Sequence, residues 1–430
     1  MAARMMLSLC RSRLLTSVPV SQACRRGTAV AAAARDKVAL NIPETRISTL
    51  PNGLRVATED SGIPTSTVGL WIDAGSRFEN DRNNGVAHFL EHMAFKGTSK
   101  RSQTDLELEV ENMGSHLNAY TSREQTVYYA KCFSKHMEQG NESWLCISLF
   151  FRCKQQYFNN NNNQFSCCRS ISRKDLVEYI TTHYKGPNIV LAAAGGVNHE
   201  QLVGLADKYL GGLKPMPAGQ THHLQPCSYT GSEFRHSDDS MPLAHIALAV
   251  EGAGWENPDT IPLMVANTII GIWDRSHGAG GNVSSNLTKS AAEGNLCNSF
   301  QSFNTCYTDT GLWGIYFICE KETIPDFIRS VQAEWRRMCF DVTDAEVTRA
   351  KNLLKTNMLL QLDGSTPICE DIGRQMLCYG RRIPLHELDA RIEAITVDTV
   401  RGVCTKYIHD QPPTVVAIGP VDQLPPIAIS

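Results

Sequence analysis

The 430-residue sequence predicts an α+β fold made of two copies of one unit. Two pairs of segments recur in the same order: residues 67–80 resemble 245–257, and residues 172–197 resemble 396–421. Within each copy, short β-rich runs bounded by turn residues alternate with stretches of helical period. Two recurring segments in one order indicate a duplicated unit, so we expect units at 41–212 and 229–430, joined by a polar linker at 213–228.

The elements of the first unit follow from local signals. The turn Pro51–Asn52–Gly53 separates two short strands within 45–56. Thr104 and Glu107 are expected to form the capping box of a helix that Gly114 ends. Ser172 and Asp175 are expected to start the closing helix of the unit. The other predicted strands are 67–73, 115–121, 125–133 and 188–194, and the other predicted helices are 86–95, 345–360 and 367–379.

The first 35 residues have the composition of a mitochondrial transit peptide. They contain six arginines and no acidic residue among many Ser, Thr, Leu and Ala, whereas a secretory signal needs one compact apolar core. We therefore expect a transit peptide at 1–40 and a mitochondrial matrix protein; an irregular basic tail is the alternative. Without these 35 residues the chain has 35 basic residues (41 less 6) against 44 acidic ones, which suits a basic partner or substrate.

Composition argues against several classes of protein. No apolar run approaches the roughly 18 residues that a membrane span needs. Fifteen cysteines without regular C-x-x-C spacing indicate free thiols rather than a disulfide framework or a zinc knuckle. Nothing in the chain has the interleaved basic and aromatic residues of a nucleic-acid surface.

The motif that carries chemistry is H-x-x-E-H, formed by His88, Glu91 and His92. On a helix over 86–95 the two histidines are one turn apart on the same face, and Glu91 lies at the edge of that face. Two neutral imidazoles at this spacing can hold one Zn²⁺, and a neighbouring carboxylate can take a proton from the attacking water. Two surface histidines beside a helix glutamate are the plainer interpretation of the motif alone.

Only the first copy has this motif. The second copy has Pro262, Val265 and Ala266 at the matching positions, an offset of 174. At the helix that closes each copy, Val177 pairs with Val400, an offset of 223. The first copy is therefore shorter than the second between the motif helix and the closing helix.

The difference in length between the two copies coincides with residues 136–170, whose composition differs from that of the rest of the chain. This segment contains five consecutive asparagines (159–163) and four of the 15 cysteines, without a sustained helical period. It is predicted to be loop or disorder with a short apolar patch.

These features together resemble the pitrilysin-type (inverzincin) metallopeptidases, and in particular the mitochondrial processing peptidases. The resemblance covers about residues 40–135 and 171–424, and runs such as HFLEHMAFKGT from His88 and LNAYTSREQTVYYA from Leu117 carry it. It implies that each half is a mostly antiparallel sheet with helices packed on one face. The core 1 subunits of the cytochrome bc1 complex share this fold but often lack motif residues, so the intact motif favours a peptidase.

The resemblance also implies an activity and partners. The chain would be the zinc-bearing subunit of a heterodimer with an α subunit, and the heterodimer would remove N-terminal presequences from proteins imported into the matrix. An extended presequence peptide would add along the strand that carries Asn118, Ala119 and Tyr120. Tyr307 would steady the scissile carbonyl. For these four residues an ordinary strand role is the plainer interpretation, and a non-catalytic bc1 core subunit is the alternative function.

One part of the family pattern is missing from this sequence. The resemblance implies a third zinc ligand, a glutamate on a helix several dozen residues after the motif, and that stretch corresponds to 136–170. Glu138 and Glu142 are the only acids there. Because a catalytic zinc site needs three protein ligands and a water, loss of this stretch would impair the enzyme. Two explanations stay open: a subunit that has lost its metal site, or an error of exon joining.

Overall fold

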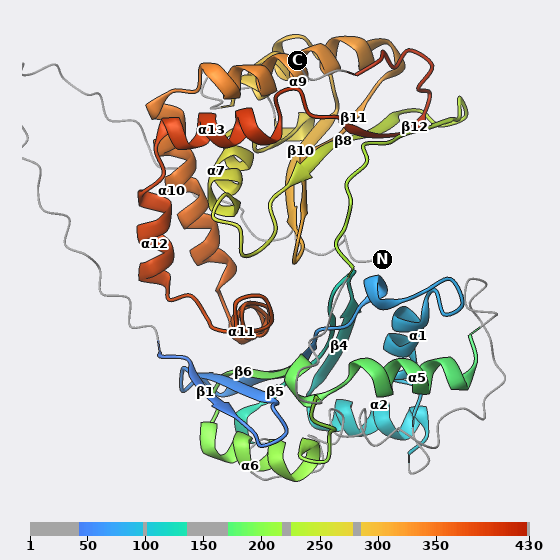
Figure 1. Ribbon diagram of the computed structural model, residues 1–430, viewed down its shortest axis with the longest axis vertical. Helices are drawn as coiled ribbons and strands as arrows, with labels where there is room; N and C mark the ends of the chain where they lie inside the picture. Colours follow the sequence, from blue (N-terminus) through green and yellow to red (C-terminus); the bar gives the residue numbers. More distant parts are fainter. Residues whose placement is uncertain (1–42, 98–100, 136–170, 217–224, 278–284, 428–430) are drawn as a thin grey trace, which may run out of the picture. The chain divides into compact units, whose positions relative to one another are not determined.

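The computed structural model describes residues 43–97, 101–135, 171–216, 225–277 and 285–427, which belong to one compact unit (Figure 1). The predicted transit peptide, the segment 136–170 and most of the central part of the predicted linker lie outside the described residues.

Six strands form the first sheet, in the order β1-β2-β6-β3-β5-β4. β2 and β6 are parallel, and the other neighbouring pairs are antiparallel. The predicted turn at Pro51–Gly53 does join two strands, and the predicted pair near 115–133 is present as β4 and β5. The bounds are β1 Arg46–Thr49, β2 Arg55–Asp60, β3 Thr65–Ile72, β4 His116–Thr121, β5 Thr126–Phe133 and β6 Ile189–Gly195.

The second sheet has the order β7-β12-β8-β11-β10-β9, again with one parallel pair, β7 and β12. Five strands match the first sheet in order and direction, because β2-β6-β3-β5-β4 corresponds to β7-β12-β8-β11-β10. The α+β fold class of two related sheets is therefore confirmed. The bounds are β7 Glu233–Ser237, β8 Ala244–Gly252, β9 Ile272–Asp274, β10 Ser299–Cys306, β11 Gly311–Cys319 and β12 Thr414–Gly419.

Helices surround the two sheets. In the first half they are α1 Val86–Met93, α2 Gln103–Asn112, α5 Arg173–His183 and α6 His199–Leu210. In the second half they are α7 Thr260–Ile270, α8 Asn286–Glu293, α9 Ile324–Phe340, α10 Asp344–Gln361, α11 Ser365–Tyr379, α12 Leu385–Glu393 and α13 Val397–Tyr407. The predicted cap of α2 is wrong, because the capping box is formed by Ser102 and Asp105, not by Thr104 and Glu107.

The closing helices of the two halves show the offset of the repeat. Ser172 caps α5 and Thr396 caps α13, each in a capping box, which gives an offset of 224 rather than 223. The predicted pairing of Val177 with Val400 is therefore wrong by one residue. Leu176 is the residue that matches Val400, and both are buried.

The helix α11 packs on the face of the first sheet opposite to α1, an arrangement that the sequence did not predict. Successive residues of β3 point to opposite faces, so Leu70 joins the core under α1 whereas Trp71 joins Ile372 and Met376 of α11. Gly373 permits this close packing, because a Cβ there would lie 2.0 Å from the Trp71 indole. A helix from the second half of the sequence thus completes the core of the first sheet.

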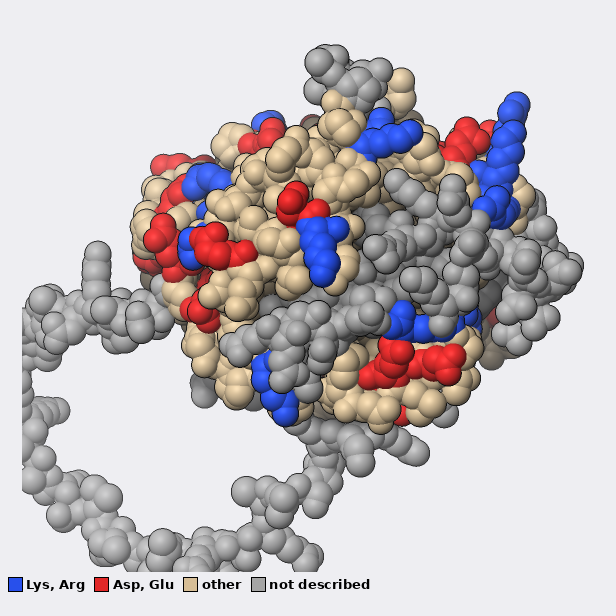
Figure 2. Space-filling view, turned by 90° about the horizontal axis from the view of Figure 1, so that it is seen from below, with Lys and Arg blue, Asp and Glu red and all other residues tan. Residues whose placement is uncertain are grey.

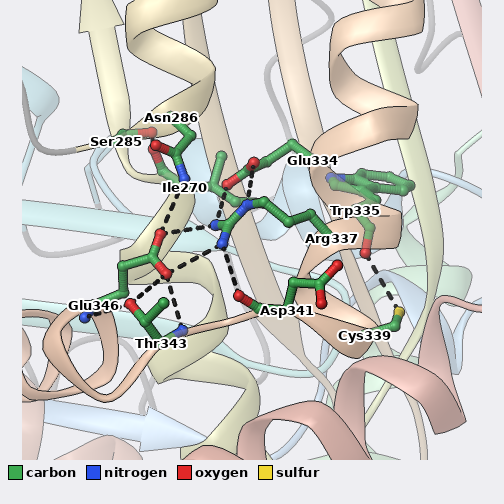
Figure 3. Close-up of polar contacts among 10 residues, drawn as sticks. All are labelled: Ile270, Ser285, Asn286, Glu334, Trp335, Arg337, Cys339, Asp341, Thr343 and Glu346. Atoms are coloured by element: carbon green, nitrogen blue, oxygen red, sulfur yellow. Dashed lines mark hydrogen bonds and ion pairs between the residues drawn. The ribbon is translucent and has the colours of Figure 1, made fainter.

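Arg337 joins the end of α9 to the start of α10 (Figure 3). Its guanidinium donates to Glu334 at 2.8 and 2.9 Å and to Glu346 at 2.8 and 3.1 Å. Glu346 also accepts from Thr343 as the capping box of α10, and from Asn286 of α8 at 3.1 Å. Since both carboxylates are largely buried, this network fixes the connection between the two longest helices of the second half.

The described surface carries mixed charge. Acidic and basic side chains are interspersed on the face shown in Figure 2. Among the residues that the structure describes, no helix has both the length and the apolar composition that crossing a bilayer requires.

Candidate metal centre and substrate edge

One face of the motif helix α1 packs against the hydrophobic core of the first sheet. Val86, Ala87 and Leu90 are buried in the cluster formed with β3, β6 and α5. His88 lies on the other side and is exposed, while Glu91 and His92 are half-buried. The apolar spacing of this short helix therefore leaves all three motif residues accessible.

The two histidine rings converge. Their Nε2 atoms lie 3.1 Å apart, and the ring planes meet at 83°. Two nitrogens that ligate one tetrahedral Zn²⁺ are about 3.3–3.4 Å apart, as Zn–N bonds of about 2.0–2.1 Å require. The pair thus fits two positions of a zinc site with little movement of either ring.

Glu91 lies close enough to Tyr128 of β5 for its charge to act on the phenol. Burial raises the pKa of the Tyr128 phenol, and the neighbouring Tyr184 and Glu91 raise it further. The carboxylate of Glu91 is therefore close to β5, on which Tyr128 lies, and to the partly solvated edge of α1.

A third ligand is not found in the described part of the chain. No group of three His, Cys, Asp or Glu side chains there could hold a metal ion. Glu138 and Glu142 lie outside the described residues. The described residues therefore offer two candidate ligands, His88 and His92, of the three protein ligands that a catalytic zinc site needs.

The second half cannot provide an equivalent site at the matching helix. Pro262, Val265 and Ala266 of α7 are buried in the core of the second sheet. These three residues have no metal-binding side chain and are buried, so the matching helix of the second half has no counterpart of the motif.

The predicted peptide-binding residues lie on β4, which is an edge strand of the first sheet. The Ala119 N–H donates to the Asn118 Oδ1 at 2.8 Å rather than to β5. Since alternate N–H groups of an edge strand point away from its partner, the Ala119 amide is directed to the open edge. The Asn118 side chain therefore occupies the hydrogen-bonding position that this amide offers at the open edge.

Tyr120 has a different environment from Asn118 and Ala119. Its side chain packs with Trp71 and α11, and its hydroxyl donates to Glu370 at 3.3 Å. Burial, and then the charge of Glu370, raise the pKa of Tyr120. The structure therefore gives Tyr120 packing partners within the chain, which is the plainer of the two roles considered for it.

Tyr307 begins the turn between β10 and β11. Its N–H donates to the Thr310 carbonyl at 2.8 Å, and its carbonyl accepts from the Trp255 N–H at 2.9 Å. The next residue, Thr308, donates its N–H and its hydroxyl to Glu124, each at about 3.0 Å. Glu124 lies three residues after the end of β4, so the turn of Tyr307 is attached to the loop that follows the candidate peptide edge.

Two groups near the motif were missed in the sequence analysis. Glu79 accepts hydrogen bonds from the first amides of α1, and Arg77 forms ion pairs with Glu124 and Asp309. The sequence did contain a signal for the capping role of Glu79, because this glutamate lies shortly before a helix whose N-cap residue is a glycine. The ion pairs had no signal, because Asp309 lies 232 residues from Arg77.

Comparison with protein families gives two matches that cover most of the described chain. Residues 55–147 match the model described as Insulinase (Peptidase family M16), and residues 170–354 match the Peptidase M16 inactive domain. Residues 148–169, between the two matches, fall within the segment of unusual composition.

Individual relatives are similar over nearly their whole length. The chain is 59% identical to the mitochondrial-processing peptidase subunit beta of Bos taurus, covering 90% of this chain and 87% of the relative. It is 46% identical to the human cytochrome b-c1 complex subunit 1, mitochondrial, covering 89% and 88%. A chain of the solved complex III2 from Candida albicans has the same fold, with a TM-score of 0.75 over 89% of this chain and 97% of that chain, at 24% identity.

Proposed function

The chain belongs to the M16 peptidase family, and on that premise we propose that it is the zinc-bearing subunit of a mitochondrial processing peptidase. Its substrates are the N-terminal presequences of proteins imported into the matrix, and its partner is an α subunit. The observation that carries the proposal is the 3.1 Å approach of the His88 and His92 Nε2 atoms on an exposed helix face.

The proposed chemistry assigns a role to each placed residue. His88 and His92 hold Zn²⁺, which when bound supplies a Lewis acid for the scissile carbonyl. Glu91 takes a proton from the attacking water and delivers it to the leaving amine. The open edge of β4 aligns the substrate backbone through the Ala119 amide, and this needs little sequence in the peptide.

The remaining assignments are proposals of the same kind. Residues 1–40 are the transit peptide that directs the chain to the matrix, and residues 213–228 join the two halves. The third ligand is Glu138 or Glu142 if the chain is an active enzyme, since these are the acids of the segment after β5.

Zinc content tests the proposal directly. The chain without residues 1–40, purified alone and with an α subunit, should retain about one zinc per polypeptide, and the pair should cleave a presequence peptide. The Glu91→Gln variant should keep the zinc and lose the cleavage. If the wild-type chain retained no zinc, the peptidase proposal would fail for this sequence.

A non-catalytic subunit of the cytochrome bc1 complex is the second candidate. The similarity to the human b-c1 subunit 1 favours it. Co-purification of the chain with membrane-bound cytochromes would support this function, whereas a soluble pair with an α subunit would support the peptidase.

A further inference from the structure

The motif helix does not provide its own N-terminal cap. Its N-cap residue is Gly85, with φ of 90° and no side chain to accept a hydrogen bond. Glu79 takes this role from outside the helix, and its two carboxylate oxygens accept from the Gly85 N–H at 2.7 Å and the Ala87 N–H at 2.8 Å. A carboxylate at this position satisfies free amides and also interacts favourably with the helix dipole.

Glu79 is in turn held by the short helix η1, Ser76–Phe78. The Glu79 N–H donates to the Ser76 carbonyl at 3.2 Å, and the Arg77 N–H donates to the Arg123 carbonyl at 2.7 Å. The position of the capping carboxylate therefore depends on the position of Arg77, two residues earlier in the chain.

The side chain of Arg77 binds to the second half. It makes a bidentate pair with Asp309, both bonds at 2.7 Å, and donates to Glu124 at 2.6 Å and to the Gln225 carbonyl at 2.9 Å. The side chains of Arg77 and Glu124 are only 12% and 7% exposed, so solvent weakens their contact little, whereas the side chain of Asp309 is 31% exposed. The hydrogen bond from Arg77 lowers the pKa of Asp309 to about 2, which keeps Asp309 charged at neutral pH.

The second half lacks this arrangement at its own matching helix. Glu256 is at the position of Glu79 in the repeat, and it is exposed. The N-cap residue of α7, Asp259, makes no side-chain cap and instead binds Lys406 and Tyr407. The repeat retained the glutamate, but only the half with the metal motif uses it to hold a helix start.

We infer that Asp309, in the half without a metal motif, positions the metal-motif helix of the other half through Arg77 and Glu79. The three are positioning residues, because none of them is a metal ligand or a member of the motif. The same contacts hold the turn that carries Tyr307, so one network sets this turn and the start of α1. The inference rests on the proposed function for its meaning, but its contacts can be tested without metal.

Amide hydrogen exchange of the whole metal-free protein tests whether Asp309, Arg77 and Glu79 together hold the start of α1. In Glu79→Gln, exchange of the peptide spanning residues 85–97 should rise about fivefold, as expected for loss of a charged cap. In Asp309→Asn, exchange of the same peptide should rise about two- to threefold, although residue 309 is distant from it in sequence. Asp105→Asn is the matched control, because it removes the carboxylate cap of α2 and should change only the peptide spanning 103–112.

Each outcome decides the inference. Unchanged exchange at 85–97 in Glu79→Gln would overturn it, and so would a change in Asp309→Asn confined to 307–310. Asp309→Glu, which keeps the charge, should restore part of the protection. Zinc competition should show weaker binding in Glu79→Gln and Asp309→Asn but not in Asp105→Asn. If the wild type binds no zinc, the proposed function fails, and the exchange results still decide this inference.

Discussion

The Nε2 atoms of His88 and His92 lie 3.1 Å apart on the exposed face of an eight-residue helix. The opposite face of that helix is anchored by Val86, Ala87 and Leu90, which are almost completely buried. The helix is therefore fixed by apolar contacts that the candidate metal residues do not share. A substitution at the exposed His88 can change metal binding with little effect on the fold.

Replacing either histidine should remove the metal. His88→Ala or His92→Ala is expected to reduce retained zinc from about one per polypeptide to near zero. In His88→Ala, which changes an exposed side chain, the free energy of unfolding of the metal-free protein should change by less than about 0.5 kcal/mol. Elemental analysis and chemical denaturation measure the two quantities. His386→Ala, at an exposed histidine of α12, is the control and should leave both unchanged. Full zinc retention in His88→Ala would show that the metal is held elsewhere.

Glu91→Gln should separate metal binding from chemistry. The amide cannot accept the proton, so kcat for a presequence peptide should fall by a factor of about 10²–10⁴ while zinc content is unchanged. Steady-state kinetics of the pair with an α subunit would measure this effect. A variant that kept its kcat would exclude Glu91 as the base.

Peptide binding at the edge of β4 should weaken when the Ala119 N–H is removed. Ala119→Pro removes an N–H that does not bond to β5, and proline is tolerated on edge strands, so the fold should persist. Loss of one backbone hydrogen bond to the peptide should raise KM by about five- to tenfold. Ala119→Ser keeps the N–H and serves as the control. Equal KM values for the two variants would argue against peptide binding at this edge.

The Arg337 network should be important for stability. Arg337→Met leaves the buried carboxylates of Glu334 and Glu346 without their partner, which should cost about 3 kcal/mol of unfolding free energy at pH 7. Arg329→Met, in an exposed pair on the same helix, should cost less than about 1 kcal/mol. Denaturant titration of both variants makes the comparison, and equal losses would contradict the importance of burial.

The same network predicts a pH dependence. Burial alone would raise the pKa of Glu346, but hydrogen bonds from Arg337 and Thr343 outweigh it and lower the pKa. A group with a lowered folded pKa stabilises the fold above its unfolded pKa and loses this effect as the pH falls through the folded value. The stability difference between wild type and Arg337→Met should therefore shrink as the pH falls below about 4.

Asp73 should show the opposite dependence. Burial, and then the charge of Glu124, raise its pKa to about 6 against the opposing effect of Arg55. A carboxyl group with a raised folded pKa favours the fold at low pH, and this contribution is lost as the pH rises through about 6. Asp73→Asn should therefore stabilise the protein by about 2 kcal/mol at pH 8 and change little at pH 4. Thermal melts at both pH values would measure this, and destabilisation at pH 8 would refute it.

Most of the elements were predictable because their signals are local. The strands near 45–56 and 115–133 follow from turn residues and alternation, although β2 extends to Asp60, and the start of α5 follows from Ser172 and Asp175. Errors arose where two local signals competed. Ser102 and Thr104 are both good helix caps, and the sequence alone could not decide which of them the chain uses.

The sequence by itself determined the fold class, the duplication and the pair of histidines. Each depends on residues close in sequence, or on segments that recur, so no knowledge of distant contacts was needed. The tertiary structure decided which partners those elements meet. It placed α11 on the first sheet, Asp309 on Arg77 and Glu79 on the start of α1. Such contacts follow from packing and burial across hundreds of residues, where sequence spacing carries no information about distance.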